Sequence, residues 1–245
     1  MRRAAAILWL LARRKAPLTL SEIARATGML PSTALHILRE LAAADLIETD
    51  ERSKKYGLGN GILALAGAAG RRDPFADLSE PYLHDIADRH NVTATATALI
   101  DDRHTACVIS ISPPSDLSLN VTLGGRVPRL AGAAGRCIAM HAKERPEDLQ
   151  REFQNIRWQI PLPFDRWWDE VDQVRVKGFA EDDGVFSLGV VTLAAAVVNP
   201  DNSIAGVIGA ASISATLDGD RKRRIAESLL AAAEAIAGAL KTQSA

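Results

Sequence analysis

The chain has 245 residues, enough to bury a sizeable core in one domain or two, and 47% of them are hydrophobic. Two cysteines exclude a disulfide framework, and five scattered histidines show no metal-ligand spacing, so neither a metal nor another cofactor is expected. The formal net charge of −1 is unevenly divided: residues 1–72 hold 12 Lys/Arg and 6 Asp/Glu, whereas residues 73–245 hold 17 and 24. A basic part followed by an acidic part suggests a nucleic-acid-binding module joined to a module with another task.

The first 15 residues, MRRAAAILWLLARRK, imitate a signal peptide because two arginines precede an apolar run. Three cations follow the run at once, without a small-residue cleavage site, and the run is too short to span a bilayer. We therefore expect residues 3–15 to form a helix of a cytoplasmic protein. Since Trp9 and Leu10 make this helix apolar nearly all round, it must be covered on more than one side, either within its own domain or also by a second subunit.

Two short helices are predicted next, over residues 19–41. Thr19 and Glu22 have the spacing of a capping box that begins a helix, and Gly28 suits the left-handed position that ends it. Pro31 fits the first turn of the following helix. The buried face of that helix is predicted from apolar residues at helical spacing: Ala34, Ile37, Leu38 and Leu41.

A hairpin is predicted after these helices, with strands at 46–49 and 54–58 and a basic turn between them. The order of helix, helix, turn, helix and hairpin predicts a winged helix-turn-helix over residues 1–59. Polar and cationic side chains on the outer face of the third helix and in the turn suit contacts with bases and phosphates. The candidate DNA contacts are Pro31, Ser32, Thr33, Leu35, His36, Arg39, Arg52, Lys54 and Lys55. A helical protein-interaction module is the alternative for the same segment.

The remaining chain mixes strands with helices, which predicts an antiparallel sheet packed with helices, an α+β domain over residues 74–245. A linker helix is expected over residues 60–73. The further helices are expected at 79–90, 146–156, 165–177 and 219–241. The strands are expected at 91–100, 104–112, 117–123, 190–198 and 204–213, the first of them half-buried because of its alternating pattern.

Several residues of this second part could line a ligand site. Small residues fill the segment 131–138 at an expected helix start, where they allow either a ligand or a packed element to approach the backbone. Asp182 belongs to a pair of adjacent carboxylates, for which a catalytic role is not expected. Ser212 and Ser214 alternate on one predicted strand, so their hydroxyls are expected on one side, with Thr192 on the neighbouring strand adding a third. These hydroxyls form either a solvent-facing row or the polar lining of a pocket.

Six segments, in this order, resemble the IclR family of bacterial transcriptional regulators over nearly the whole chain. They are LSEIARATGMLPSTALHILREL (20–41), YGLG (56–59), LAGAAGR (130–136), GFAEDD (178–183), GVVTLAAAV (189–197) and SIS (212–214). The resemblance implies a winged helix-turn-helix that binds operator DNA as a dimer or dimer of dimers. It also implies a GAF-like carboxy-terminal domain that binds a small effector, often an organic or aromatic acid.

By position, the resemblance implies that backbone amides and side chains of six residues contact the effector: Ala133, Ala134, Asp182, Thr192, Ser212 and Ser214. The chain departs from the family pattern where that pattern has Cys, His and Ser/Thr, namely at Thr192, Leu130 and Gly132, so the effector's identity does not follow. No nucleophile, base and orienting group occur at motif spacing, and an enzyme is not expected. The rival function is a small-molecule sensor or enzyme whose helical amino-terminal module binds protein.

Overall fold

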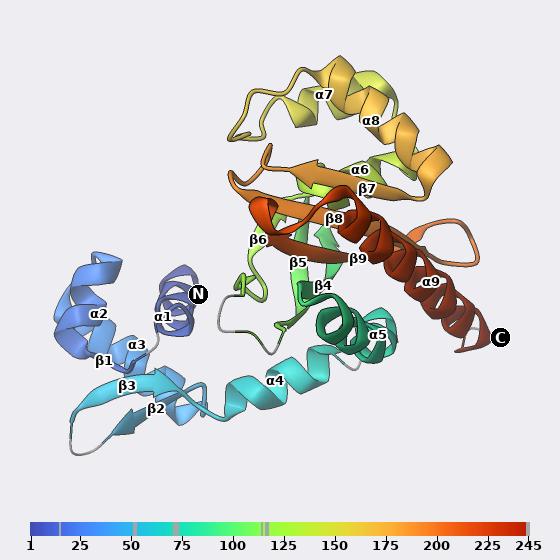
Figure 1. The fold of residues 1–245 in the computed structure, drawn as a ribbon. Coiled ribbons are helices and arrows are strands. Elements are labelled where there is room, and N and C mark those ends of the chain that lie inside the picture. Colours follow the sequence, from blue (N-terminus) through green and yellow to red (C-terminus); the bar gives the residue numbers. More distant parts are fainter. Residues whose placement is uncertain (15, 51–52, 71–73, 114, 116–117, 244–245) are drawn as a thin grey trace. The chain divides into compact units, whose positions relative to one another are not determined.

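The computed structural model describes residues 1–14, 16–50, 53–70, 74–113, 115 and 118–243. The chain divides into two compact units, Met1–Asp73 and Pro74–Ala245 (Figure 1). Each unit has a hydrophobic core of its own, so each is described by itself.

The first unit is a winged helix-turn-helix, as predicted. Its helices are α1 (Arg2–Ala12), α2 (Leu20–Thr27), α3 (Pro31–Ala43) and α4 (Gly61–Gly70). Its antiparallel sheet has the order β1-β3-β2 and consists of β1 (Leu18–Thr19), β2 (Ile47–Asp50) and β3 (Lys55–Leu58). The core joins the first three helices to the sheet through Ile7, Leu11, Ile23, Leu38, Leu41 and Ile47.

Local sequence signals explain where α2 begins and ends. Glu22 Oε2 accepts a hydrogen bond from Thr19 N (2.8 Å), and Thr19 Oγ1 accepts one from Glu22 N (3.3 Å). These two bonds form the predicted capping box and occupy two amides that the helix itself leaves without partners. Gly28 ends the helix with a φ of 68°, and Pro31 lies in the first turn of α3. The short strand β1, which pairs with β3, was not predicted because two residues are too few for an alternating pattern.

The second unit is built on a six-stranded antiparallel sheet with the order β6-β5-β4-β9-β8-β7 (Figure 1). The strands are β4 (Thr93–Asp101), β5 (His104–Ile111), β6 (Arg126–Pro128), β7 (Phe179–Asp183), β8 (Val190–Val198) and β9 (Ile204–Ile213). The helices are α5 (Pro74–His90), α6 (Gly132–Met140), α7 (Pro146–Phe153), α8 (Phe164–Lys177) and α9 (Gly219–Gln243). A 3₁₀ turn, Ser214–Thr216, follows β9.

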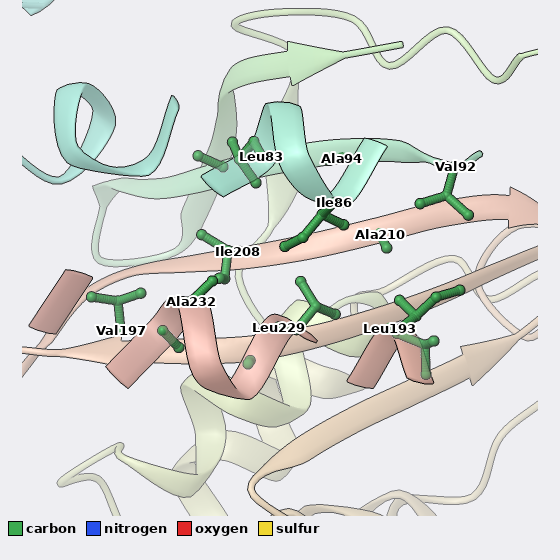
Figure 2. Packing of buried hydrophobic residues seen from close by; sticks show 14 of the residues in the cluster. Leu83, Ile86, Val92, Ala94, Leu193, Val197, Ile208, Ala210, Leu229 and Ala232 are labelled. Atoms are coloured by element: carbon green, nitrogen blue, oxygen red, sulfur yellow. The ribbon is translucent and has the colours of Figure 1, made fainter. Parts of the chain in front are cut away.

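Helices cover both faces of this sheet. Side chains of α5 and α9, such as Leu83 and Leu229, pack on one face against Leu193 and Ile208 (Figure 2). On the other face α6 and α8 pack against alternate residues of the same strands, including Ala194. Because successive strand residues point to opposite faces, the pairing register decides which of the two layers each residue meets.

The strand expected at 91–100 is half-buried, as predicted: Ala94, Ala96 and Ala98 of β4 are buried, whereas Thr95 and Thr97, which alternate with them, are partly exposed. Two expectations for this unit were wrong. The described residues of 117–123 form no strand. The backbone there is bound by a side chain instead of a neighbouring strand: the Leu119 carbonyl accepts a hydrogen bond from Thr93 Oγ1 (2.8 Å). The short β6 pairs with β5 in its place. The strand β7 was not predicted, because its sequence FAEDD lacks strand-favouring residues after Phe179.

Candidate functional site

The outer face of α3 carries the side chains expected to meet DNA. Pro31, Ser32, His36 and Arg39 are exposed, whereas Thr33 and Leu35 are half-buried. Arg39 forms no ion pair with any residue that the structure describes. An exposed guanidinium without an ion-pair partner among the described residues, about two turns beyond the start of the helix, is available for a base edge or a phosphate.

The wing between β2 and β3 presents two further cations. Lys54 and Lys55 are exposed, and Lys54 has a φ of 55° at the tip of the turn. The turn is held by Asp50, whose carbonyl accepts from Lys54 N (2.8 Å) and whose carboxylate accepts from Ser53 N (3.2 Å). The third expected wing cation, Arg52, lies outside the described residues. The wing therefore offers a pair of exposed ammonium groups suited to the phosphate backbone.

A cavity of about 160 Å³ lies in the second unit between the start of α6 and the sheet face formed by β4, β9 and β8. Ala133 and Ala134 line it from α6, and Thr192 lines it from β8. These three expected effector contacts are therefore brought together. The rest of the lining is mostly apolar, and the described residues around the cavity include no charged side chain.

The start of α6 gives this cavity its polar character. The first amides of an α-helix have no intrahelical acceptor and lie at the positive end of the helix dipole, which suits a carboxylate. Ala131 caps the helix without a side-chain hydrogen bond, so no side chain occupies these amides from that position. The small residues also serve packing: a Cβ on Gly135 would come within 2.0 Å of the Leu130 carbonyl carbon. The packing reading therefore holds at Gly135, whereas Ala133 and Ala134 lie against the open space of the cavity.

Asp182 is buried beside the cavity rather than exposed to it. Its Oδ2 accepts from Arg136 Nη1 (3.0 Å), and its Oδ1 accepts from the backbone N of Phe186 (3.0 Å). Arg136 is only 2% exposed and also binds the Gly132 carbonyl (2.8 Å) and the Glu170 carboxylate (2.6 Å). The ion pair thus ties β7 to α6 and α8, and both carboxylate oxygens of Asp182 already have partners.

Ser212 and Ser214 lie away from the cavity. In the β8–β9 pairing Thr192 is opposite Ala211, whereas Ser212 is opposite Val191, so Thr192 and Ser212 are on different faces of the sheet. Ser212 lines a separate hollow of about 170 Å³ and its hydroxyl is 3.0 Å from Thr216 Oγ1.

Ser214 does not share a strand with Ser212, because β9 ends at Ile213 and Ser214 begins the 3₁₀ turn. Its buried hydroxyl has no hydrogen bond of good geometry within the described structure, although it lies close enough to Asp183 to favour the charged carboxylate. The pKa of Asp183 is lowered chiefly by the ammonium of Lys222 (2.7 Å). The expected row of hydroxyls is therefore not formed.

Several lining residues were missed in the sequence, among them Thr95, Thr97 and Phe186. Thr95 and Thr97 lie on β4 and point their side chains to the face that α6 covers, and Phe186 lies between β7 and β8. The alternation of threonine and alanine at 93–98 was a usable signal for the first two, since the threonines share one face. Phe186 had no local signal, because only the fold brings it to the cavity.

Both cysteines are buried thiols. Burial raises the pKa of Cys107 to about 11 and that of Cys137 to about 12. Cys137 Sγ donates to the Ala194 carbonyl (3.4 Å), so the thiol is part of the contact between α6 and the sheet. A reactive thiolate on α6 does not fit these surroundings.

Within the described residues no three His, Cys, Asp or Glu side chains are grouped as metal ligands. Among the same residues no helix has the length and apolar character to cross a membrane.

Comparison with known proteins agrees with this architecture. Residues 1–51 match the model of the IclR helix-turn-helix domain, and residues 69–238 match that of the bacterial transcriptional regulator IclR C-terminal domain. The glycerol operon regulatory protein of Streptomyces griseus is 27% identical over 210 residues, which cover 85% of this chain and 82% of that protein.

Two solved structures show the same fold over the whole chain. An IclR transcriptional regulator from Alicyclobacillus acidocaldarius is 24% identical, with a TM-score of 0.81 over 98% of this chain and 97% of that one. An IclR homologue from Microbacterium hydrocarbonoxydans, complexed with 4-hydroxybenzoate, is 18% identical, with a TM-score of 0.78 over 97% of each chain. Since the two family models together match most of the sequence, the chain belongs to the IclR family of bacterial transcriptional regulators, with a helix-turn-helix domain and an effector-binding carboxy-terminal domain.

Proposed function

We propose that this regulator works in the cytoplasm as a homodimer or dimer of dimers whose paired α3 helices bind two operator half-sites. The observation that carries the DNA-binding surface is the set of exposed cations on one helix-turn-helix: Arg39, Lys54 and Lys55. Arg39 reads bases or a phosphate from the major groove, and the wing lysines bind the phosphate backbone. Pro31, Ser32, Thr33, Leu35 and His36 complete the surface that faces the DNA.

The subunit contact is assigned to α1. Its inner side chains Ile7 and Leu11 are buried in the first unit, yet Trp9 on the same helix is 51% exposed. Leu63 and Leu65 of α4 are exposed as well. Large apolar side chains gathered on exposed helices favour association, and two-fold symmetry matches the palindromic half-sites of helix-turn-helix dimers.

The effector is assigned to the α6 cavity, and its class is a small organic acid. Ala133 and Ala134 offer backbone amides to the carboxylate, and Thr192 offers a hydroxyl to another polar group. The 4-hydroxybenzoate complex of the Microbacterium relative supports an aromatic acid of this size. Asp182 is assigned an indirect part, since both of its oxygens are bound within the protein, and Ser212 and Ser214 are not assigned to the cavity.

A band-shift assay with the DNA upstream of the protein's own gene tests this function. We expect sequence-selective binding that weakens steeply with salt, and a change in that binding when the organic acid is present. The effector acts by favouring one arrangement of the subunits, so it must bind the DNA-competent and DNA-incompetent arrangements with different affinities. If no salt-sensitive, selective binding occurred at any ligand condition, the proposal would fail.

A further inference from the structure

The loop between β7 and β8, residues 184–189, forms one wall of the α6 cavity. It begins and ends at glycines with positive φ, Gly184 at 79° and Gly189 at 75°. Between them Phe186 lines the cavity, opposite the start of α6. A Cβ placed on Gly132 would lie 3.8 Å from Phe186 Cδ1, which is ordinary van der Waals contact. The phenyl ring therefore lies directly over the amides that we assign to the carboxylate.

Backbone hydrogen bonds fix the position of this ring. Asp182 Oδ1 accepts from Phe186 N (3.0 Å), and the Val185 carbonyl accepts from both Gln159 N and Ile160 N (3.0 Å each). On its outer side the ring packs edge-on against Trp158, with 5.9 Å between centroids. Phe186 is thus held at its own backbone N, through its neighbour Val185 and by the ring of Trp158, so moving it out of the cavity breaks these contacts.

The size of the cavity defines what fits beneath this ring. An apolar cavity of about 150 Å³ holds one benzene ring, and the cavity here measures about 160 Å³. Its polar groups are the α6 amides and the hydroxyls of Thr95, Thr97 and Thr192. A second fused ring exceeds this volume, so it has to extend through the open side of the cavity or displace Phe186.

We propose that Phe186 is the specificity-determining residue of the effector site, limiting it to acids with a single ring or a smaller body and excluding acids with two fused rings. This inference rests on the proposed function, because it takes the α6 cavity as the effector site. Asp182 is then a positioning residue: it sets the limit by holding the backbone of Phe186, and it does not touch the ligand.

The test uses the full-length protein, with benzoate and 2-naphthoate as probes in isothermal titration calorimetry. The wild type is expected to bind benzoate more tightly than 2-naphthoate. In Phe186→Ala the preference should shift towards 2-naphthoate by about tenfold or more, the size of effect typical for a cavity that gains or loses apolar volume. Phe186→Leu should give an intermediate shift, which keeps the test informative if the alanine variant melts too low to titrate.

Phe164→Ala is the matched control. Phe164 is half-buried in the same aromatic cluster, where it packs against Phe153 and Trp167, but it does not line the cavity. Removing the Phe164 ring loses a similar amount of aromatic packing, but it should leave the ratio of the affinities for benzoate and 2-naphthoate unchanged.

Three results would overturn the inference: an unchanged ratio in Phe186→Ala, an equal shift in Phe164→Ala, or no binding of either acid to the wild type and Phe186→Ala. If neither acid binds either protein, the α6 cavity is not a site for ring-sized acids, and this result says nothing against DNA binding or against another effector. The proposed function fails on separate grounds, namely if no compound in a metabolite screen alters operator binding by the wild type.

Discussion

At the scale of single residues, Arg39 and the wing lysines are exposed cations with different expected tasks. Arg39→Ala should weaken binding to the preferred operator by about 1–3 kcal/mol and relax the preference among sequences, because a guanidinium can bind a base edge. The double variant Lys54→Ala with Lys55→Ala should weaken binding to all sequences alike and reduce the salt slope by about 2, or about 1 for each phosphate contact. Fluorescence anisotropy with operator and scrambled duplexes over a range of KCl concentrations measures both effects.

Lys241→Ala is the control for these cation variants, since Lys241 is exposed on α9 in the other unit and its charge change is the same as that of one wing lysine. It should leave affinity and salt slope unchanged. An Arg39→Ala variant that weakened every sequence equally would assign Arg39 to a phosphate and contradict base readout.

The two thiols give a pH-dependent prediction at the same scale. Their folded pKa values of about 11 and about 12 exceed the ordinary value of 9.0. Below pH 9 the thiols are protonated in the folded and in the unfolded protein. Between pH 9 and 11 the unfolded chain loses these protons first, so the free energy of unfolding falls as the pH rises.

The burial of the thiols also predicts their reactivity. At pH 8 a thiol-specific aromatic disulfide should react slowly with the native protein and rapidly with both thiols in guanidinium. Rapid reaction of one thiol in the native protein would contradict its burial.

At the scale of elements, the buried Arg136–Asp182 pair joins α6 to β7. Arg136→Met should lower the free energy of unfolding of the second unit by about 3–5 kcal/mol, because it leaves the Asp182 carboxylate buried without its cation. Arg151→Met is the matched control: Arg151 pairs with Asp148 on the surface of α7, where an exposed pair contributes less than about 1 kcal/mol. Urea unfolding followed by circular dichroism measures both. Equal losses in the two variants would show that burial does not distinguish the pairs.

Elements with signals in neighbouring residues could be predicted from the sequence, and those that depend on distant contacts could not. The capping box at Thr19 and Glu22 and the end of α2 at Gly28 are local hydrogen-bonding and backbone effects, and the structure has both. By contrast, the short strand β6 forms by pairing with β5, in place of the strand expected at 117–123, and no pattern within a few residues contains that information. The strand β7 likewise forms only because β8 is beside it.

The candidate site shows the same division. Small residues at an expected helix start drew attention to the segment that holds Ala133 and Ala134, but only the resemblance to the IclR family named these two residues. Grouping Ser212 with Thr192 required the pairing register of β8 and β9, and a difference of one residue places a side chain on the opposite face. Phe186 reaches the cavity through a hydrogen bond to Asp182 and a contact with Trp158, which are properties of the folded unit.

At the scale of the whole molecule, the α6 cavity and the helix α3 belong to different units. The first unit's sequence is basic and the rest is acidic, so electrostatic attraction favours DNA at the first unit. Under the proposed function, an effector bound in the second unit therefore changes operator binding through the arrangement of subunits and not through a contact with DNA. Such a response requires that the subunits stay associated, which makes the subunit contact a test of the whole mechanism.

Trp9→Asp tests that contact. Trp9 is half-exposed on α1, so a charge there should leave the fold of the first unit intact but oppose burial of the helix against a second subunit, since burying an unpaired carboxylate is costly. We expect sedimentation velocity to show a shift from dimer or larger species to monomer. Operator affinity should fall by about 100-fold or more, because two linked half-site contacts become one. Val176→Asp is the control, as Val176 is an apolar helix residue that is 87% exposed on α8, in the other unit. If Trp9→Asp kept its assembly state, or if Val176→Asp lost it, the assignment of the subunit contact to α1 would be wrong.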